Sequence, residues 1–82
     1  MFSENEICDK IRSIIPDIGE CGVNINVSFD DRNDAWSVEL KEGHRSLRTF
    51  VEPEDALSCV NKDRCIGLEF QIAQLKDNIK NM

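Results

Sequence analysis

The residues best suited to chemistry lie in one short stretch, residues 42–50, which reads EGHRSLRTF and holds the chain's single histidine and two arginines. A histidine can act as a general base for a neighbouring serine or cysteine. If this stretch is a strand, the neighbours of His44 on its face are Lys41, Glu39 and Ser46, and no cysteine lies there. We therefore expect a solvent-facing histidine and no catalytic pair.

The four cysteines, at positions 8, 21, 59 and 65, include no Cys-x-x-Cys pair of the kind that zinc ribbons use. The first ten residues have neither a basic start nor an apolar segment, so we expect no signal peptide and a cytoplasmic location. Reduced cysteines buried as small hydrophobic side chains would follow. A thiol or metal site that draws on Cys59 and Cys65 remains an alternative.

The paired carboxylates Asp30-Asp31 and Glu54-Asp55 fall in an expected loop and at an expected helix start, where solvation and the helix dipole explain them. The chain contains no glycine-rich phosphate loop, no calcium-binding loop pattern and no His-x-x-x-His pair. The sequence therefore predicts no enzyme activity, no cofactor and no bound metal.

The charge balance argues against nucleic acid as a partner. Sixteen acidic and ten basic residues give a net charge of −6, whereas affinity for phosphate backbones comes from lysine and arginine. Apolar runs are only a few residues long, so no membrane span is expected. Residues 41–51 carry a formal +2 and are the one locally basic part of the chain.

Periodicity divides the 82 residues into helices and strands of one domain, 1–82. Ser3 and Glu6 have the spacing of a capping box, which predicts a helix over about 4–15 that ends before Pro16. Alternating apolar and polar residues then predict strands at about 23–30, 35–41 and 44–51. A helical region over about 54–80 follows, and residues 61–64 could interrupt it.

Two proposed turns fix the register of these strands. A loop at residues 31–34 pairs Ser28 with Ser37 and Asn26 with Glu39. A two-residue loop at Glu42-Gly43 sets the pairs of the second hairpin, which are Lys41–His44, Glu39–Ser46 and Ser37–Arg48. Both turns give a sheet with one apolar and one polar face.

The predicted fold is α+β, with α-β-β-β-α order, a three-stranded antiparallel meander and helices packed on one face. In element order and size the chain resembles double-stranded-RNA-binding domains. That family grips phosphates with lysines at the start of its second helix, where this chain has the acidic stretch VEPEDALSCV. The resemblance therefore extends to element order and not to function, although RNA or nucleotide binding along residues 41–50 stays as an alternative.

Two surfaces could instead contact a protein. One is the open polar face of the sheet, and the other is a stripe of apolar residues at alternating steps of three and four on the last helix. We predict a non-catalytic protein-interaction module, which binds a protein partner or forms a homodimer. The candidate contact residues are Lys41, His44, Arg48 and Phe50 on the sheet, and Leu68, Ile72, Leu75 and Ile79 on the helix.

Overall fold

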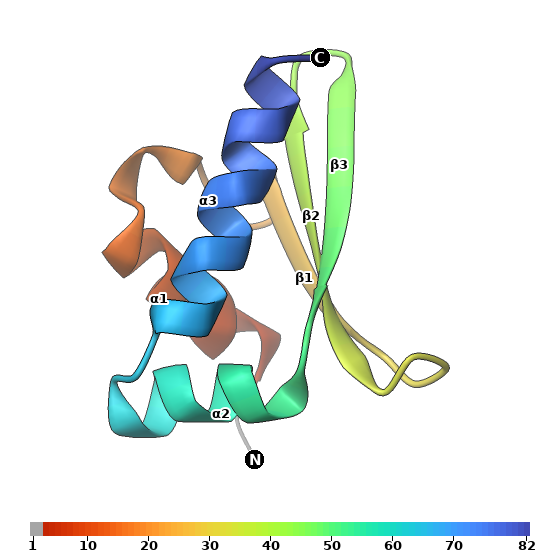
Figure 1. Cartoon of the computed structure of the whole chain (residues 1–82). Coiled ribbons are helices and arrows are strands. Elements are labelled where there is room, and N and C mark those ends of the chain that lie inside the picture. Colours follow the sequence, from red (N-terminus) through yellow and green to blue (C-terminus); the bar gives the residue numbers. More distant parts are fainter. Residues whose placement is uncertain (1–2) are drawn as a thin grey trace.

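The computed structural model describes residues 3–82 and confirms the predicted α+β class. One helix is followed by a three-stranded antiparallel sheet and then by two more helices, with a short 3-10 helix after the first helix (Figure 1). In chain order the elements are α1 (Glu4–Ile14), η1 (Pro16–Ile18), β1 (Ile25–Asp30), β2 (Ala35–Glu42), β3 (Arg45–Val51), α2 (Pro53–Lys62) and α3 (Ile66–Lys80).

The predicted capping box starts α1. Ser3 Oγ accepts a hydrogen bond from the backbone N–H of Glu6 at 3.3 Å, and Glu6 Oε1 accepts one from the backbone N–H of Ser3 at 3.1 Å. These bonds satisfy two donors that the helix itself leaves without partners. Pro16 ends the helix, because a proline disfavours helical geometry at the preceding residue.

The sheet has the order β1-β2-β3, and the predicted register of its first hairpin is confirmed: Ser28 pairs with Ser37 and Asn26 with Glu39. The predicted register of the second hairpin is wrong by two residues. Its loop is Gly43-His44, so that Lys41 pairs with Ser46, Glu39 with Arg48 and Ser37 with Phe50.

Backbone geometry explains this shift. Gly43 has a φ of +62°, whereas His44 does not have a positive φ. A tight hairpin with one positive φ places glycine at the first central position, while the predicted loop would have required that conformation of Glu42. A shift of two residues keeps every side chain on its predicted face. It moves His44 out of the strand and into the turn.

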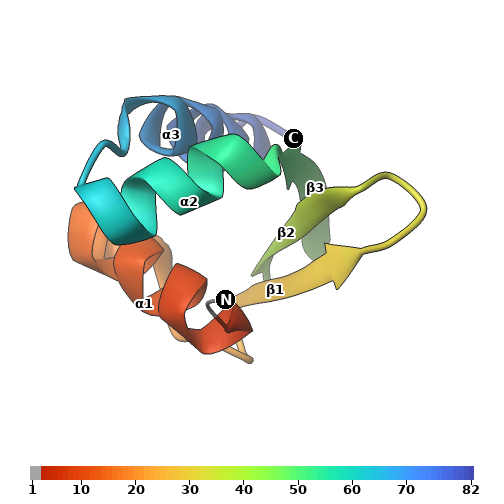
Figure 2. The ribbon, with the colours of Figure 1, turned by 90° about the horizontal axis from the view of Figure 1, so that it is seen from below.

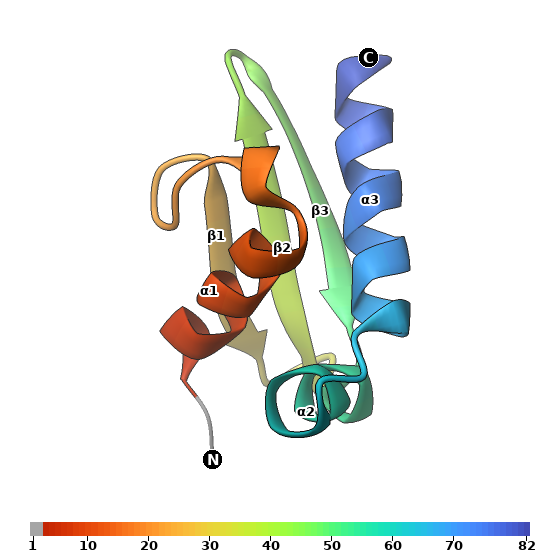
Figure 3. The ribbon, with the colours of Figure 1, turned by 90° about the vertical axis from the view of Figure 1, so that its left-hand side faces the viewer.

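Helices α1 and α3 lie against the apolar face of the sheet, and α2 lies across one end of it (Figures 1 and 3). The two long helices and the sheet enclose a single cluster of buried apolar side chains. Its largest fully buried side chains are Ile7, Ile11, Ile25, Val38, Val51, Cys59, Leu68, Ile72 and Ile79. None of the helices within residues 3–82 covers the opposite, polar face.

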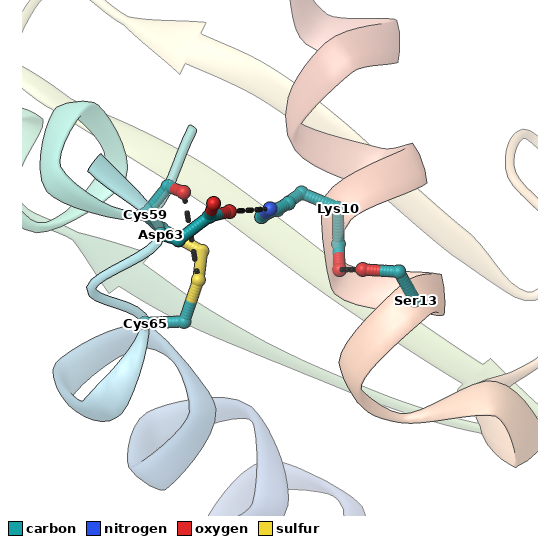
Figure 4. Close-up of a disulfide and its surroundings, with 5 residues drawn as sticks. All are labelled: Lys10, Ser13, Cys59, Asp63 and Cys65. Atoms are coloured by element: carbon teal, nitrogen blue, oxygen red, sulfur yellow. Dashed lines mark hydrogen bonds and ion pairs between the residues drawn. A yellow bond between two sulfur atoms is a disulfide. The ribbon is translucent and has the colours of Figure 1, made fainter. Parts of the chain in front are cut away.

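The last helical region is interrupted between Lys62 and Ile66. Asp63 ends α2 in the left-handed conformation, with φ +55°, and its backbone N–H donates to the Ser58 carbonyl. Its carboxylate pairs with Lys10 of α1, beside the disulfide that joins Cys59 to Cys65 (Figure 4). The interruption therefore lets α2 and α3 run in different directions while covalent and ionic links hold their connection.

All four cysteines form disulfides, Cys8–Cys21 and Cys59–Cys65. The prediction of reduced cysteines is therefore wrong, and the prediction of a cytoplasmic location is wrong with it. Disulfides form and persist in oxidising compartments. They are frequent in small secreted domains, because the hydrophobic core of such a domain is too small to stabilise the fold alone. Two disulfides in a domain of this size indicate an oxidising, extracellular or secretory location.

Candidate functional site

The open face of the sheet carries Lys41, Arg48 and Phe50, as the sequence predicted from strand parity. Arg48 Nη2 lies 3.8 Å from the carboxylate of Glu39 on the neighbouring strand, so its charge is partly balanced within the domain. Phe50 is 40% exposed, opposite Ser37. His44 is exposed in the turn at the end of this face, apart from Phe50 at the other end of β3.

The four predicted contact residues of the last helix pack inside the domain. Leu68, Ile72, Leu75 and Ile79 are buried in the core cluster, so they are inaccessible to a partner of the folded chain. The outward side of α3 carries Ile66 and Phe70 instead, which are 83% and 65% exposed.

Two cavities stand out among the described residues, and the larger of them lies at the end of the sheet where the β1–β2 hairpin, α1 and α2 come together; Figure 2 looks at the molecule from this side. It has a volume of about 570 Å³, within the range of ligand-binding clefts in proteins. We call it the apolar groove, and it is lined by Glu6, Phe29, Asp34, Trp36, Pro53, Leu57 and Asn61.

Three elements position the apolar side chains of this groove. Phe29 and Trp36 are paired across β1 and β2, and their rings meet edge to face with centroids 5.1 Å apart. Pro53, Leu57 and Asn61 follow one another at four-residue steps on α2, so they share one side of that helix. Trp36 is largely buried at 8% exposure, whereas Phe29 and Leu57 are 40% and 43% exposed. The groove therefore has a buried aromatic residue beneath two accessible apolar ones.

Carboxylates stand at the edges of the apolar groove. Glu6 comes from the first turn of α1 and Asp34 from the β1–β2 hairpin. In the same hairpin, Asp30 accepts hydrogen bonds from the Asn33 side chain at 2.9 Å and from the backbone N–H groups of Arg32 and Asn33. The Asn33 side chain in particular holds the pKa of Asp30 below its usual value, so this carboxylate is ionised at neutral pH.

A second cavity, of about 240 Å³, lies at the opposite end of the sheet, and we call it the lysine pocket. Lys76 pairs there with Asp17, and the hydrogen bond from Lys76 lowers the pKa of this carboxyl. Close by, Arg45 Nη1 donates to the carbonyls of Ile79 and Lys80 at 3.1 and 3.3 Å and so caps the negative end of α3. The pocket is lined by Asp17, Ile18, Gly19, Asn24, Leu40, Lys41, Glu42, Lys76 and Lys80.

Within residues 3–82, no group of three or more His, Cys, Asp or Glu side chains gathers where it could hold a metal ion. Cys59 and Cys65 are bonded to each other, so neither offers a thiol. His44 lines neither cavity. No helix in this part of the chain has both the length and the apolar character needed to cross a membrane.

The sequence predictions missed the apolar groove, although two signals for it were present. Phe29 and Trp36 are paired by the correctly predicted first register, at the end of the sheet next to the β1–β2 hairpin. Leu57 and Pro53 fall on one side of the helix that follows the sheet. What could not be read was the direction of α2, because that depends on the interruption near Asp63 and on the disulfide.

Comparisons of the chain with protein-family models, with curated proteins and with solved structures find no match. A proposal for the function of the chain therefore rests on the two cavities and the exposed surfaces described above.

Proposed function

We propose that this chain is a non-catalytic protein-interaction module that works in an oxidising compartment and holds its partner in the apolar groove. The observation that carries the proposal is the exposure of Phe29 and Leu57 above the buried Trp36. Aromatic and aliphatic side chains left accessible in a concave site are the usual anchors of protein contacts. A small domain gains nothing in folding stability from the parts of such side chains that remain in water.

Among residues 3–82 no nucleophile and base are assembled, which favours a binding role over catalysis. The single histidine is exposed in a turn, and the cysteines are bonded in pairs. Neither cavity has a serine, a threonine or a histidine among its lining residues, so neither holds a hydroxyl nucleophile next to a histidine base.

Selection of peptides from a random display library against the folded, disulfide-bonded protein tests this function. We expect recovered peptides to lose binding to Leu57→Asn, which replaces an apolar side chain of the groove by a neutral polar one of similar size. Val23→Asn is the matched control, because Val23 is 62% exposed and lies outside both cavities. Peptides that bind Leu57→Asn as well as the parent protein would refute the proposal.

Self-association is a second candidate, favoured by the exposed pair Ile66 and Phe70 on the outward side of α3. One apolar row on a helix can pair with its copy across a two-fold axis. Sedimentation at high micromolar concentration tests it: a dimer that Phe70→Glu dissociates would support this candidate, and a monomeric parent protein would remove it.

Binding of RNA or a nucleotide along residues 41–50 is the alternative from another class. It requires steep salt dependence and loss of binding on Arg45→Glu and Arg48→Glu. Unchanged spectra on adding RNA at low salt would remove it.

A further inference from the structure

We propose that the partner segment held by the apolar groove is basic: a lysine or arginine enters beside an apolar side chain. The apolar side chain packs on Phe29 and Leu57, and the cation lies between the carboxylates of Glu6 and Asp34. This inference rests on the proposed function, since it specifies the chemistry of the segment that the groove would bind.

The first support is the distribution of charge around the groove. Three segments that each contribute a lining residue, 3–6, 30–34 and 52–55, contain two, three and three acidic residues. Of these acids, Glu6 and Asp34 line the groove, whereas Asp55 lies beside Gly67 of α3. These eight are half of the sixteen acids of the chain, and Arg32 is the only base among them. Such a concentration of one sign attracts cationic segments and repels acidic ones before contact.

The second support is that the two lining carboxylates have no cationic partner within the described residues. Ion pairs there join Lys10 to Asp63, Arg48 to Glu39 and Lys76 to Asp17. Glu6 and Asp34 are in none of these pairs. By contrast, both lysines that pair with aspartates serve to connect elements of the domain. Among residues 3–82, the groove carboxylates are therefore not neutralised by a cation of the domain, although Glu6 Oε1 also accepts the capping-box hydrogen bond from Ser3.

The third support is the chemistry of the groove itself. Long basic side chains carry an apolar stem and a charged head, which suits a site that joins aromatic and aliphatic side chains to carboxylates. The ring faces of aromatic residues also attract cations, most strongly where water is excluded. A neutral segment could offer the carboxylates hydrogen bonds but no opposite charge, and an acidic segment would be repelled by them.

Two substitutions remove the carboxylates while keeping the local structure. Glu6→Gln preserves the capping box, because glutamine accepts the same backbone hydrogen bond. Asp34→Asn suits the positive φ of +48° at this position, which asparagine tolerates well. The matched control is Glu69→Gln with Asp77→Asn, which removes two exposed acids of α3 that line neither cavity.

The experiment measures the affinity of three peptides of equal length by fluorescence anisotropy. One alternates lysine with leucine, one alternates glutamate with leucine, and one alternates lysine with serine. We expect the lysine–leucine peptide to bind most tightly. Loss of either the charge or the apolar side chain should weaken binding by roughly tenfold or more.

The variants then locate the interaction. The double variant Glu6→Gln with Asp34→Asn should lower the affinity for the lysine–leucine peptide by roughly tenfold. The control pair should lower it by less than about twofold. Equal weakening by both pairs would show general charge attraction and overturn the inference. Equal binding of the glutamate–leucine and lysine–leucine peptides would overturn it too, while leaving the proposed function standing. If none of the peptides responds to Leu57→Asn, the proposed function itself fails.

Discussion

The two ends of the sheet are built on the same three strands, but they differ in whether their charged groups pair within the domain. At the lysine pocket, cations and anions meet inside the domain: Lys76 pairs with Asp17, and Arg45 caps α3. At the apolar groove, aromatic side chains stay accessible and the lining acids Glu6 and Asp34 lie in no ion pair among the described residues. One end pairs its charged groups within the domain, whereas the other leaves apolar side chains and two carboxylates exposed, which is why we propose it as the contact site.

Each end has its own disulfide, and removing them should have the largest effect on stability. The Cys8–Cys21 bond spans 13 residues, and Cys59–Cys65 spans 6. Replacing either pair by alanine should lower the free energy of unfolding by roughly 2 to 5 kcal/mol. The longer loop should cost more by about 0.7 kcal/mol, since loop entropy grows with the logarithm of length. Urea denaturation of both double variants measures this, and a larger loss for Cys59–Cys65 would contradict it.

Gly19, beside the lysine pocket, should not tolerate a side chain. It has φ +117°, and an added Cβ would lie 2.4 Å from Asn24 Cβ, whose side chain is held by the Glu20 backbone N–H. Gly19→Ala should cost roughly 2 to 3 kcal/mol. Gly43→Ala is the control, because a Cβ there meets nothing within 4 Å, and it should cost about 1 kcal/mol. Thermal unfolding compares the two, and equal costs would show that the pocket wall can move aside.

The exposed side chains of the apolar groove should matter little for folding, unlike the buried Trp36. Leu57→Ala removes a side chain that is 43% exposed, so it should cost about 1 kcal/mol or less. Leu68→Ala, at a core position that is 1% exposed, should cost roughly 2 to 5 kcal/mol. Chemical denaturation of both variants decides the matter. A large loss for Leu57→Ala would mean that this residue serves the core and not a partner.

The smallest expected effect is the pH dependence of stability that comes from Asp17 at the lysine pocket. The hydrogen bond from Lys76 lowers the pKa of Asp17 below its unfolded value of about 3.9. The ionised carboxylate therefore stabilises the fold above about pH 4, and this contribution is lost as pH falls through the folded pKa. Asp17→Asn should destabilise the protein at pH 7 and much less at pH 3. The exposed Asp77→Asn is the control, and a constant difference across pH would contradict the assignment.

Local signals in the sequence were enough to predict the fold class. The capping box of Ser3 and Glu6, the strand alternation and the loop at residues 31–34 all agree with the structure. The error at the second hairpin came from a local choice, the position of Gly43 within its turn. It left the faces of the sheet intact because it was a shift of two residues.

The candidate site could be predicted only in part. Parity correctly placed Lys41, Arg48 and Phe50 on the open face, but the heptad spacing of Leu68, Ile72, Leu75 and Ile79 could not distinguish a core stripe from a contact surface. Cysteine spacing does not reveal pairing, so both disulfides were missed, and the location with them. The groove depends on how α2 is oriented, which is a long-range property.

Chemical-shift mapping of the isotope-labelled, disulfide-bonded protein with the lysine–leucine peptide tests most directly whether the two ends differ in function. We expect the perturbed backbone amides to centre on residues 29–36 and 53–61, at the apolar groove. The amides around Gly19 and Lys76 at the lysine pocket should stay unchanged. Perturbations centred on the lysine pocket, or on the open face at residues 41–50, would contradict the assignment of the groove as the contact site.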